Sequence, residues 1–458
     1  MRKFTLVAAA VTAVLGTAVA QADQPTIAQV QAAITAGTAA QFWISGSSAA
    51  KNGTKAFVQA QICGGSLTSF SSASPISNPD FNAWACTATA GPDASVINVI
   101  YYRAEGGSVV GVYPIINNVN IFQLDLSAAN TTCVLSAAGV YNCPIAGTSL
   151  GNGPFDTWGP AGVVKHQSDF GISDVEPDAF VINNSPYAAP PPAGYNPGVF
   201  GPAKTQAQLK AMPHHTIFQQ TFGIVVNTNL GTNVLSKSAI ANILNGNYVD
   251  WHSVPAFGAA SPGAGVTAAS TNIFVCNREV GSGSRTAAAM YFLGDHCTPG
   301  ASSISEGGND NYATSDELVC VNTNGAAQGA PAGSVAIGYA SVDNISKLGA
   351  NTIFVNIDGH VQSNYASASG QNDFAFEATE QANGASTNPA AAGFVGFIVP
   401  KLQAIASAPQ SVQVNAIPGT PNTNLAQLPL QQSGVIFTTD FDRGGGLGNS
   451  CLGYGSVN

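Results

Sequence analysis

The sequence predicts an α/β fold in which strands and helices alternate along the chain and pack in layers. Strand-like runs, rich in β-branched and aromatic residues, occur at 95–103, 222–227 and 334–342. A helical run lies between the last two, at 236–246. Alternation of this kind is typical of α/β layers. In such sheets, ligands bind in the loops beyond the carboxyl ends of the strands.

The helical run at 236–246 carries its own start and stop signals. Ser236 or Ser238 can cap the first turn, because a serine hydroxyl accepts a hydrogen bond from a free backbone N–H there. Gly246 ends the run, as glycine commonly does after the last helical turn. The helix is therefore predicted from its ends as well as from its apolar spacing.

The size and composition of the chain limit the classes of protein it can be. Its 458 residues exceed one ordinary core, so we expect two domains or one domain with large insertions. Apolar residues make up 45%, but charged residues only 8%, against roughly a quarter in usual soluble proteins. A net charge of -10 with 14 Lys plus Arg argues against nucleic acid binding. It also argues against long-range attraction of an anion, so an anion site here must work by local geometry.

The N-terminal segment 1–22 has the features of a secretory signal peptide. Arg2 and Lys3 precede an apolar run at 4–15, and two small-x-small cleavage patterns follow at 18–22. We therefore expect a periplasmic or extracellular protein. No cysteine lies at the cleavage site, so a lipid anchor is not expected there. No other apolar run is long enough to span a bilayer, so we expect no membrane insertion of the mature chain.

The eight cysteines are expected to form disulfides, because their number is even and the chain carries an export signal. The local pairs Cys63–Cys86 and Cys133–Cys143 are the two we predict. The other four cysteines allow three connectivities, and the sequence does not choose among them. No CxxC occurs, so a zinc site is not expected. The candidates are Cys63, Cys86, Cys133, Cys143, Cys276, Cys297, Cys320 and Cys451.

Four segments share the chemistry of an anion-binding loop. They lie at 44–51 (ISGSSAAK), 105–111 (EGGSVVG), 168–177 (SDFGISDVEP) and 278–285 (REVGSGSR), each at an expected strand-to-helix junction. Small residues let the backbone approach a ligand, and hydroxyls and free N–H groups then face it. A single loop of this kind is more often a surface turn. Four of them favour a shared anion site.

These segments resemble the phosphate-binding-protein family, periplasmic substrate-binding proteins with two α/β lobes. The run from Arg278 to Ser284 resembles the family's phosphate loop, Arg-x-Asp-Gly-Ser-Gly-Thr. The run 170–174 (FGISD) resembles its acidic loop, and 235–254 and 333–342 resemble its Leu-Ser helix and its Gly-Ile-Gly-Tyr strand. Good matches cover roughly 160–345, and 44–51 and 105–111 match more weakly. The part from about 360 has no match.

The resemblance implies a two-lobe fold with a ligand cleft between the lobes. Lobe one would comprise 23–222, lobe two 223–350, and 351–458 would return to lobe one. The implied function is capture of inorganic phosphate, or a close oxyanion, for uptake through an ABC-transporter membrane permease, with no cofactor and no catalytic residue. Donors on both lobes would close the lobes on the ligand like a hinge.

The resemblance and the residue chemistry together predict the ligand-binding set. Arg278 offers a planar fork of donors to two oxyanion oxygens, although an exposed salt bridge is the common alternative for an arginine. The other donors are hydroxyls and N–H groups, some at a helix N-terminus whose partial charge favours an anion. The expected set is Ser47, Ser48, Ala49, Ser108, Ser173, Asp174, Arg278, Gly281, Ser282, Gly283 and Ser284.

Asp174 is an unusual residue beside an anion, and we interpret it as a selectivity device. A carboxylate can accept a proton still carried by phosphate near neutral pH, whereas sulfate carries none and would be repelled. The alternative for Asp174 is a turn-forming aspartate. One departure from the family is that Val280 replaces the usual acidic residue, with Glu279 one place earlier.

Two other classes of function stay open from the sequence. A phosphate-ester hydrolase on the same scaffold would need a nucleophile, and 147–151 (GTSLG) places Ser149 in a G-x-S-x-G pattern without the strand and helix that this motif requires. The adjacent His214 and His215 are more simply explained by a surface loop than by a metal site. The third class is a secreted structural protein or adhesin that keeps only the fold.

Overall fold

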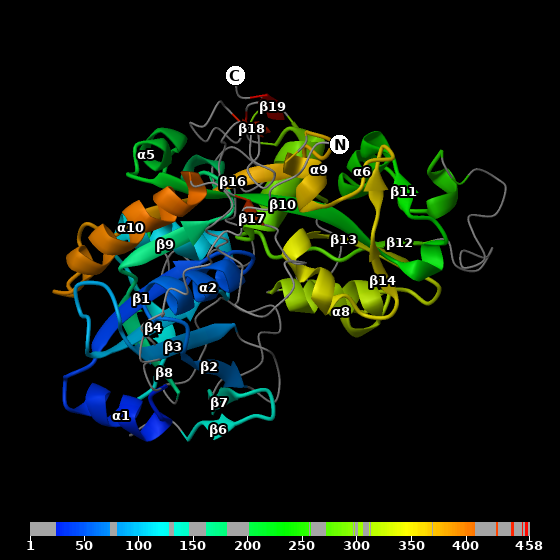
Figure 1. Cartoon of the computed structure of the whole chain (residues 1–458). Helices are drawn as coiled ribbons and strands as arrows, with labels where there is room; N and C mark the ends of the chain where they lie inside the picture. The colour runs from blue at the N-terminus through cyan, green and yellow to red at the C-terminus, as the bar shows by residue number, and fades with distance from the viewer. Residues whose placement is uncertain are drawn as a thin grey trace, which may run out of the picture.

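The chain has a mixed α/β fold with two lobes (Figure 1). The structure is a computed structural model, which describes residues 24–73, 80–127, 132–145, 162–180, 201–255, 257, 272–295, 297, 301–305, 311, 313–368, 370–407, 427–428, 441–443, 451 and 454–456. The expected signal peptide at 1–22 and the GTSLG segment at 147–151 lie outside the described residues.

One large mixed sheet runs through both lobes. Its order is β12-β13-β10-β16-β9-β1-β4-β3-β2-β7-β6, with β14 and β17 paired to β10. The strands are β1 (Ala40–Gly46), β2 (Thr68–Ala73), β3 (Phe81–Thr87), β4 (Ile97–Arg103), β6 (Val134–Leu135), β7 (Val140–Pro144), β9 (Phe170–Ser173), β10 (His215–Asn227), β12 (Ile273–Val275), β13 (Val335–Ser341), β14 (Thr352–Phe354), β16 (Ala375–Ala382) and β17 (Gln427–Leu428).

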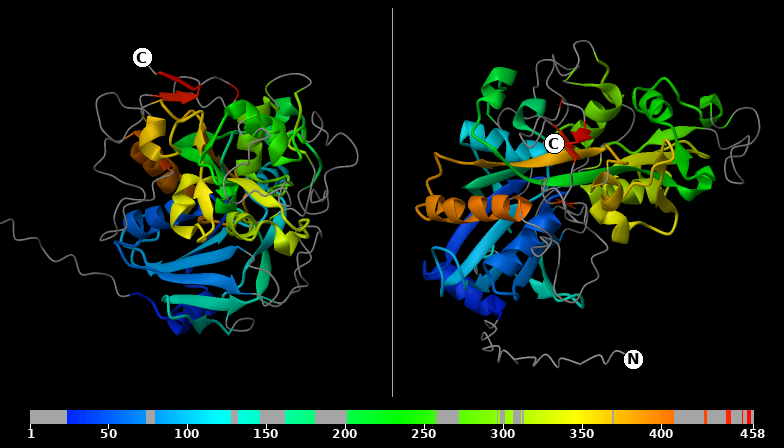
Figure 2. Two further views of the ribbon diagram at one scale, coloured as in Figure 1. Left: turned by 90° about the vertical axis from the view of Figure 1, so that its right-hand side faces the viewer. Right: turned by 45° about the horizontal axis from the view of Figure 1, so that its top comes forward.

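Strand β10 links the two lobes. Its first part, 215–221, pairs antiparallel with β16 on the side of lobe one, and 222–226 pairs antiparallel with β13 of lobe two. Figure 2 shows β10 and β16 side by side where the lobes meet. A single strand therefore belongs to both halves of the molecule. The lobe boundaries predicted at residues 222 and 350 stay a prediction.

Helices cover the faces of the sheet in each lobe. The part of the chain predicted as lobe one contains α1 (Ile27–Thr35), α2 (Lys51–Gln61), α3 (Tyr113–Asn117), α5 (Gln206–Lys210) and α10 (Ala391–Ser407). The part predicted as lobe two contains α6 (Lys237–Leu244), α7 (Gly283–Ala288) and α8 (Thr314–Asn322), and α9 (Asn364–Ala368) lies between α8 and α10 in the chain. The 3₁₀ turns η1 (Ser108–Gly111) and η8 (Val342–Lys347) follow strands β4 and β13. Three small two-stranded sheets complete the fold: β5 (Asn120–Leu124) with β8 (Val163–Gln167), β11 (Val234–Leu235) with β15 (Asn356–Ile357), and β18 (Phe441–Arg443) with β19 (Tyr454–Ser456).

The four elements expected from the sequence are present, three of them with small shifts at their ends and β10 with a much earlier start. Strand β4 lies within the expected 95–103, β13 within 334–342, and β10 extends the expected 222–227 backwards to His215. Helix α6 begins after Ser236, whose hydroxyl accepts a hydrogen bond from the N–H of Ala239 at 3.1 Å. Gly246 follows the helix with a φ of +80°, which explains why glycine stands there.

Apolar packing holds each lobe together and also joins the two, because the cluster around Trp251 includes Val110 and Tyr113. In lobe one, the rings of Phe42 on β1 and Phe394 on α10 stack with centroids 3.7 Å apart, and Phe57 of α2 is buried in the same cluster. In lobe two, Trp251 is fully buried and its indole N–H donates to the carbonyl of Val335 at 3.1 Å. Full burial of side chains of this size contributes about 1.5–3 kcal/mol each. The core therefore fixes the strand ends on which the polar loops sit.

All eight cysteines are paired in four disulfides. The predicted pairs Cys63–Cys86 and Cys133–Cys143 are confirmed. Of the three connectivities that the sequence left open, the chain adopts Cys276–Cys320 together with Cys297–Cys451. Cys276–Cys320 ties the chain just after β12 to helix α8, whereas Cys297–Cys451 ties lobe two to the C-terminal part of the chain.

A thiol titration tests this pairing. We expect the mature protein, denatured without reductant, to expose no free thiol, and to expose eight after reduction, because every cysteine is in a disulfide. Two or more free thiols before reduction would contradict the pairing. Peptide mapping of the unreduced protein would then identify which pair is open.

Candidate functional site

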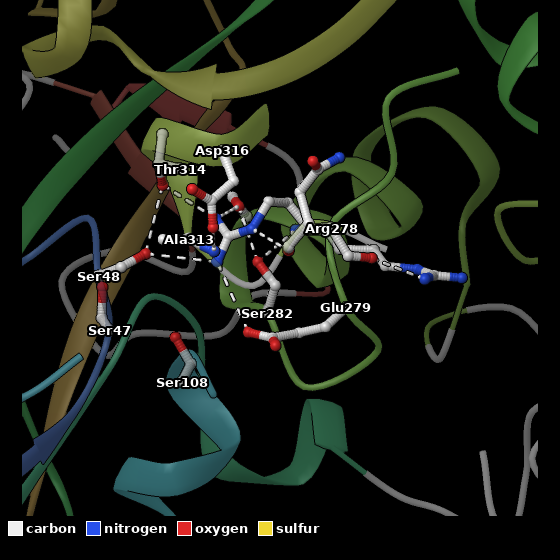
Figure 3. A network of polar contacts seen from close by, with 12 residues as sticks. Ser47, Ser48, Ser108, Arg278, Glu279, Ser282, Ala313, Thr314 and Asp316 are labelled. Atoms are coloured by element: carbon white, nitrogen blue, oxygen red, sulfur yellow. Dashed lines mark hydrogen bonds and ion pairs between the residues drawn. The ribbon is translucent and has the colours of Figure 1, made fainter. Parts of the chain in front are cut away.

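The four polar loops meet at the junction of the two lobes. Three of them follow the carboxyl ends of β1, β4 and β9, and β1 pairs in parallel with both of the other two strands. Parallel strands end at the same edge of a sheet, so their loops gather there. The fourth loop, 278–285, leaves β12 of lobe two and lies against them (Figure 3).

Asp174 lies at the centre of the lobe-one half of the site. It is 2% exposed, and its carboxylate accepts hydrogen bonds from the hydroxyls of Ser47 and, at 3.1 Å, of Ser108. Its own backbone N–H donates to the Ser108 hydroxyl at 3.0 Å. Burial raises the pKa of Asp174 to about 6, while the two serine hydroxyls and Arg278 act in the opposite direction. The folded chain therefore disfavours ionisation of this carboxyl relative to an ordinary aspartate.

Arg278 brings a positive charge into the same junction with 1% exposure. Its Nε donates to the carbonyl of Asn311 at 3.0 Å, and its Nη1 donates to the hydroxyls of Thr314 at 2.9 Å and Ser284 at 3.3 Å. Its Nη2 reaches the hydroxyl of Ser48 in lobe one at 3.5 Å. The guanidinium is thus held by lobe two and faces lobe one, so it is not the exposed arginine of the alternative interpretation.

Glu279 supplies a carboxylate to Arg278 although it stands one place earlier than the family pattern. Its Oε1 lies 3.6 Å from Nη2 of Arg278, and the residue is 2% exposed. Val280, at the position of the family's acidic residue, is only partly buried. The loop therefore places a carboxylate beside the arginine from position 279 and not from position 280.

The serines of the 278–285 loop form the start of helix α7. Ser282 is the N-cap, and its hydroxyl accepts from the N–H of Arg285 at 3.4 Å and lies 2.9 Å from the hydroxyl of Ser284. Arg285 turns back and donates from Nη1 to the carbonyl of Arg278 at 2.8 Å. The helix continues beyond residue 288 as a π-helix to Leu293. Hydroxyls and a helix start therefore face the junction from lobe two.

Two glycines let the lobes approach each other. A Cβ at Gly283 would overlap Ser108 Oγ and lie 2.5 Å from Asp174 Oδ2, and a Cβ at Gly281 would overlap the side chain of Val109. The N–H of Val109 donates to the carbonyl of Gly281 at 2.9 Å, which joins the backbones of the two lobes. The predicted Gly281 and Gly283 thus serve close approach between the loops.

The remaining predicted residues have the following surroundings. The Ser48 hydroxyl lies 3.3 Å from that of Thr314, across the junction. Ala49 is buried at the start of α2. The Ser173 hydroxyl donates to the carbonyl of Val175 at 2.6 Å, inside its own loop. The structure therefore brings the serines of three loops together, while Ser173 has a local backbone partner.

Sequence reasoning missed the contribution of helix α8 and the residues before it. Thr314 and Asn311 contact Arg278 directly, and Tyr339 accepts from the backbone N–H of Arg278 at 3.1 Å. Behind them, burial raises the pKa of Glu317 to about 8, against the effects of Arg278 and of a 2.6 Å hydrogen bond from the N–H of Tyr339. The run Thr-Ser-Asp-Glu at 314–317 is a helix-start signal that could have marked this N-terminus.

The histidines considered for a metal site have other partners. His214 Nδ1 lies 2.8 Å from the carbonyl of Met212, and His215 is bonded to Glu380 on β16. Within the described ranges, no group of three or more His, Cys, Asp or Glu is arranged to hold a metal ion. In the same ranges, no helix has the length and apolar character needed to cross a membrane.

No protein-family model and no curated protein matches the chain. Solved structures that match it include a protein from Clostridium perfringens assigned as a phosphate ABC transporter substrate-binding protein, with bound phosphate (13% identity, TM-score 0.41, covering 78% of this chain and 92% of that one). Others are an ABC-type phosphate transport receptor from Vibrio cholerae (15%, 0.32, 51% and 77%) and PstS from Borrelia burgdorferi (11%, 0.32, 78% and 92%). These TM-scores mark a partial correspondence of the backbones, so the function proposed below rests on this chain's own residues.

The raised pKa of Asp174 predicts a dependence of stability on pH. A carboxyl with a pKa of about 6 in the folded chain and about 4 in the unfolded chain costs stability as pH rises from about 4 to 6. The cost at pH 8 is at most about 3 kcal/mol. Asp174→Asn should therefore unfold at higher urea than wild type at pH 8, and the gain should shrink towards pH 4. If Asp174→Asn gained the same free energy of unfolding at pH 4 and pH 8, the raised pKa of Asp174 would be contradicted.

Proposed function

We propose that this chain binds inorganic phosphate, or a closely related oxyanion, at the junction of its lobes. The observation that carries the proposal is the meeting of a buried arginine of lobe two, Arg278, with three serines of lobe one. Ser48 contacts the arginine, and Ser47 and Ser108 donate to the buried carboxyl of Asp174. Arginine and hydroxyl groups are the usual donors to oxyanion oxygens. Because these donors are buried, water does not compete for them, and each hydrogen bond to a ligand is stronger than it would be at the surface.

The chemistry of Asp174 favours phosphate over sulfate as the ligand. Phosphate keeps a proton near neutral pH and can donate it to a carboxylate in a charge-assisted hydrogen bond. Sulfate has no proton to donate and meets like-charge repulsion from Asp174 and Glu279. Both of these carboxylates lie near the guanidinium of Arg278, so a fully ionised ligand is disfavoured.

The two-lobe arrangement suits a binding protein that encloses its ligand. Donors on lobe one and lobe two both face the junction, so a ligand held by both stabilises the closed arrangement. We propose a role in phosphate uptake outside the cytoplasm, with the signal peptide directing export and a membrane permease receiving the ligand. A phosphate-ester hydrolase is the alternative, and release of phosphate from a chromogenic ester by the pure protein would favour it.

Arg278→Ala should weaken phosphate binding by about 2–5 kcal/mol, the cost of truncating one partner of a buried charge pair. It should also lower the melting temperature, because the guanidinium bonds to Asn311 and Thr314. Phosphate binding is measured by calorimetry well below the melting temperature, and circular dichroism shows that the variant is folded. Loss of affinity is then distinguished from loss of stability. Lys401→Ala, on helix α10, is the control that removes a charge elsewhere. An unchanged dissociation constant would exclude Arg278 from the site.

Wild type should prefer phosphate to sulfate by at least about 100-fold, or about 2.7 kcal/mol. Asp174→Asn should narrow this gap, mainly by admitting sulfate, because the amide no longer repels an unprotonated anion. Calorimetric titration of both proteins with both anions at pH 8 measures the gap. Equal binding of sulfate and phosphate by wild type would reduce the ligand assignment to an unspecified small oxyanion.

A further inference from the structure

A cluster of four charged side chains lies where helix α2 of lobe one meets the 3₁₀ turn η8, which follows β13 of lobe two. The side chains are those of Lys51 and Asp80 on the lobe-one side, and Asp343 and Lys347 on η8. The chain has only 14 basic and 24 acidic residues among 458. Such a balanced group at one junction is therefore notable in this protein.

A hydrogen bond joins the two sides of this cluster directly. The amide Nδ2 of Asn52, on α2, donates to Oδ2 of Asp343 at 3.3 Å. On the η8 side, Asn344 Nδ2 donates to the other carboxylate oxygen of Asp343 at 2.8 Å, and Lys347 Nζ donates to Asn344 Oδ1 at 2.9 Å. Both oxygens of Asp343 are thus used, one of them by the opposite lobe.

On the lobe-one side, the carboxylate of Asp80 also has a lysine and an asparagine beside it. Lys51 forms an ion pair with Asp80, and Asn82 Nδ2 donates to the same carboxylate at 2.8 Å. Burial alone would raise the pKa of Asp80, but Lys51, Asn82 and, from the other side of the junction, Lys347 together lower it. Asp343 is likewise within the electrostatic reach of Lys51. Lys51 is therefore attracted to Asp343 and Lys347 to Asp80 across the junction, while the two lysines repel each other.

This cluster lies beside the groups that face the proposed ligand, and its Asp343 is near enough to add to the effect of burial in raising the pKa of Asp174. Lys51 begins helix α2, three residues after Ser48, and Asn52 is exposed rather than buried in the site. Contacts of Ser48 with Arg278 and Thr314 close the lobes at the site itself. The contact of Asn52 with Asp343 joins them beside it.

We propose that Asn52, Lys51 and Asp80 on one side and Asp343 and Lys347 on the other form a polar latch that stabilises the closed arrangement of the lobes independently of ligand. The latch adds a second set of contacts to those at the site. Opening breaks the hydrogen bond from Asn52 to Asp343 and separates Lys51 from Asp343 and Lys347 from Asp80, although it also relieves the repulsion between the two lysines. The latch determines the fraction of molecules that are closed before an anion binds. This fraction in turn affects the apparent affinity for the anion.

The substitution Asn52→Asp tests the latch with almost no change of shape. It replaces a donor to Asp343 by a second carboxylate, so an attractive contact becomes a repulsive one. Asn229→Asp is the matched control, because Asn229 is an exposed asparagine at the far end of β10 in lobe two. Asn52→Ala, which removes the contact without adding charge, serves if the aspartate variant does not fold.

Distances between the lobes give the readout without phosphate. Nitroxide labels on cysteines introduced at Ala28 of α1 and Val249 of lobe two, both exposed, report the separation by pulsed electron resonance. We expect Asn52→Asp to lower the ratio of closed to open molecules about tenfold, consistent with the loss of one hydrogen bond to a charged group. Asn52→Ala should give a smaller shift, and Asn229→Asp none.

Three results would overturn the latch. They are unchanged distances in Asn52→Asp and Asn52→Ala, an equal shift in Asn229→Asp, and a wild type with no closed population. Because no phosphate is present in these measurements, a protein that fails to bind phosphate can still show the latch. Conversely, a protein that binds phosphate tightly can still lack it, so the two proposals fail separately.

Discussion

A buried positive charge at Arg278 is the interaction on which much of the junction depends. Taking a guanidinium out of water costs several kcal/mol unless its donors are satisfied and its charge is balanced. Here the donors go to a carbonyl and to hydroxyls of both lobes, and Glu279 lies beside the charge. The start of α8, the loop before α7 and the serines of lobe one are therefore constrained together by one side chain.

The carboxyls around this charge show the cost of the arrangement. Burial raises the pKa of both Asp174 and Glu317, so their ionised forms are disfavoured in the folded chain. A core built only for stability would replace such groups with apolar ones. Buried carboxyls with raised pKa values beside a buried arginine are more typical of a functional site than of a packing contact.

Local signals predicted the parts of the fold that local chemistry determines. Helix α6 was predictable because Ser236 caps it and Gly246 ends it, and the disulfide Cys63–Cys86 because its residues are close in the chain. The site loops were predictable as loops because glycine and serine cluster at strand ends. Thr314 was missed because it lies thirty-six residues beyond Arg278, with no glycine-serine pattern around it. The order of strands in the sheet depends on long-range pairing, for which the sequence carries no local signal.

Strand β10 gives the junction a mechanical property that follows from its pairing. Since one continuous strand pairs with β16 in its first part and with β13 in its second, the lobes are joined by hydrogen-bonded ribbon and not by a loose linker. Such a ribbon bends and twists elastically, and it resists shear because shear would break its ladder of hydrogen bonds. Relative motion of the lobes therefore has to bend or twist this ribbon, which meets a resistance that a flexible tether lacks.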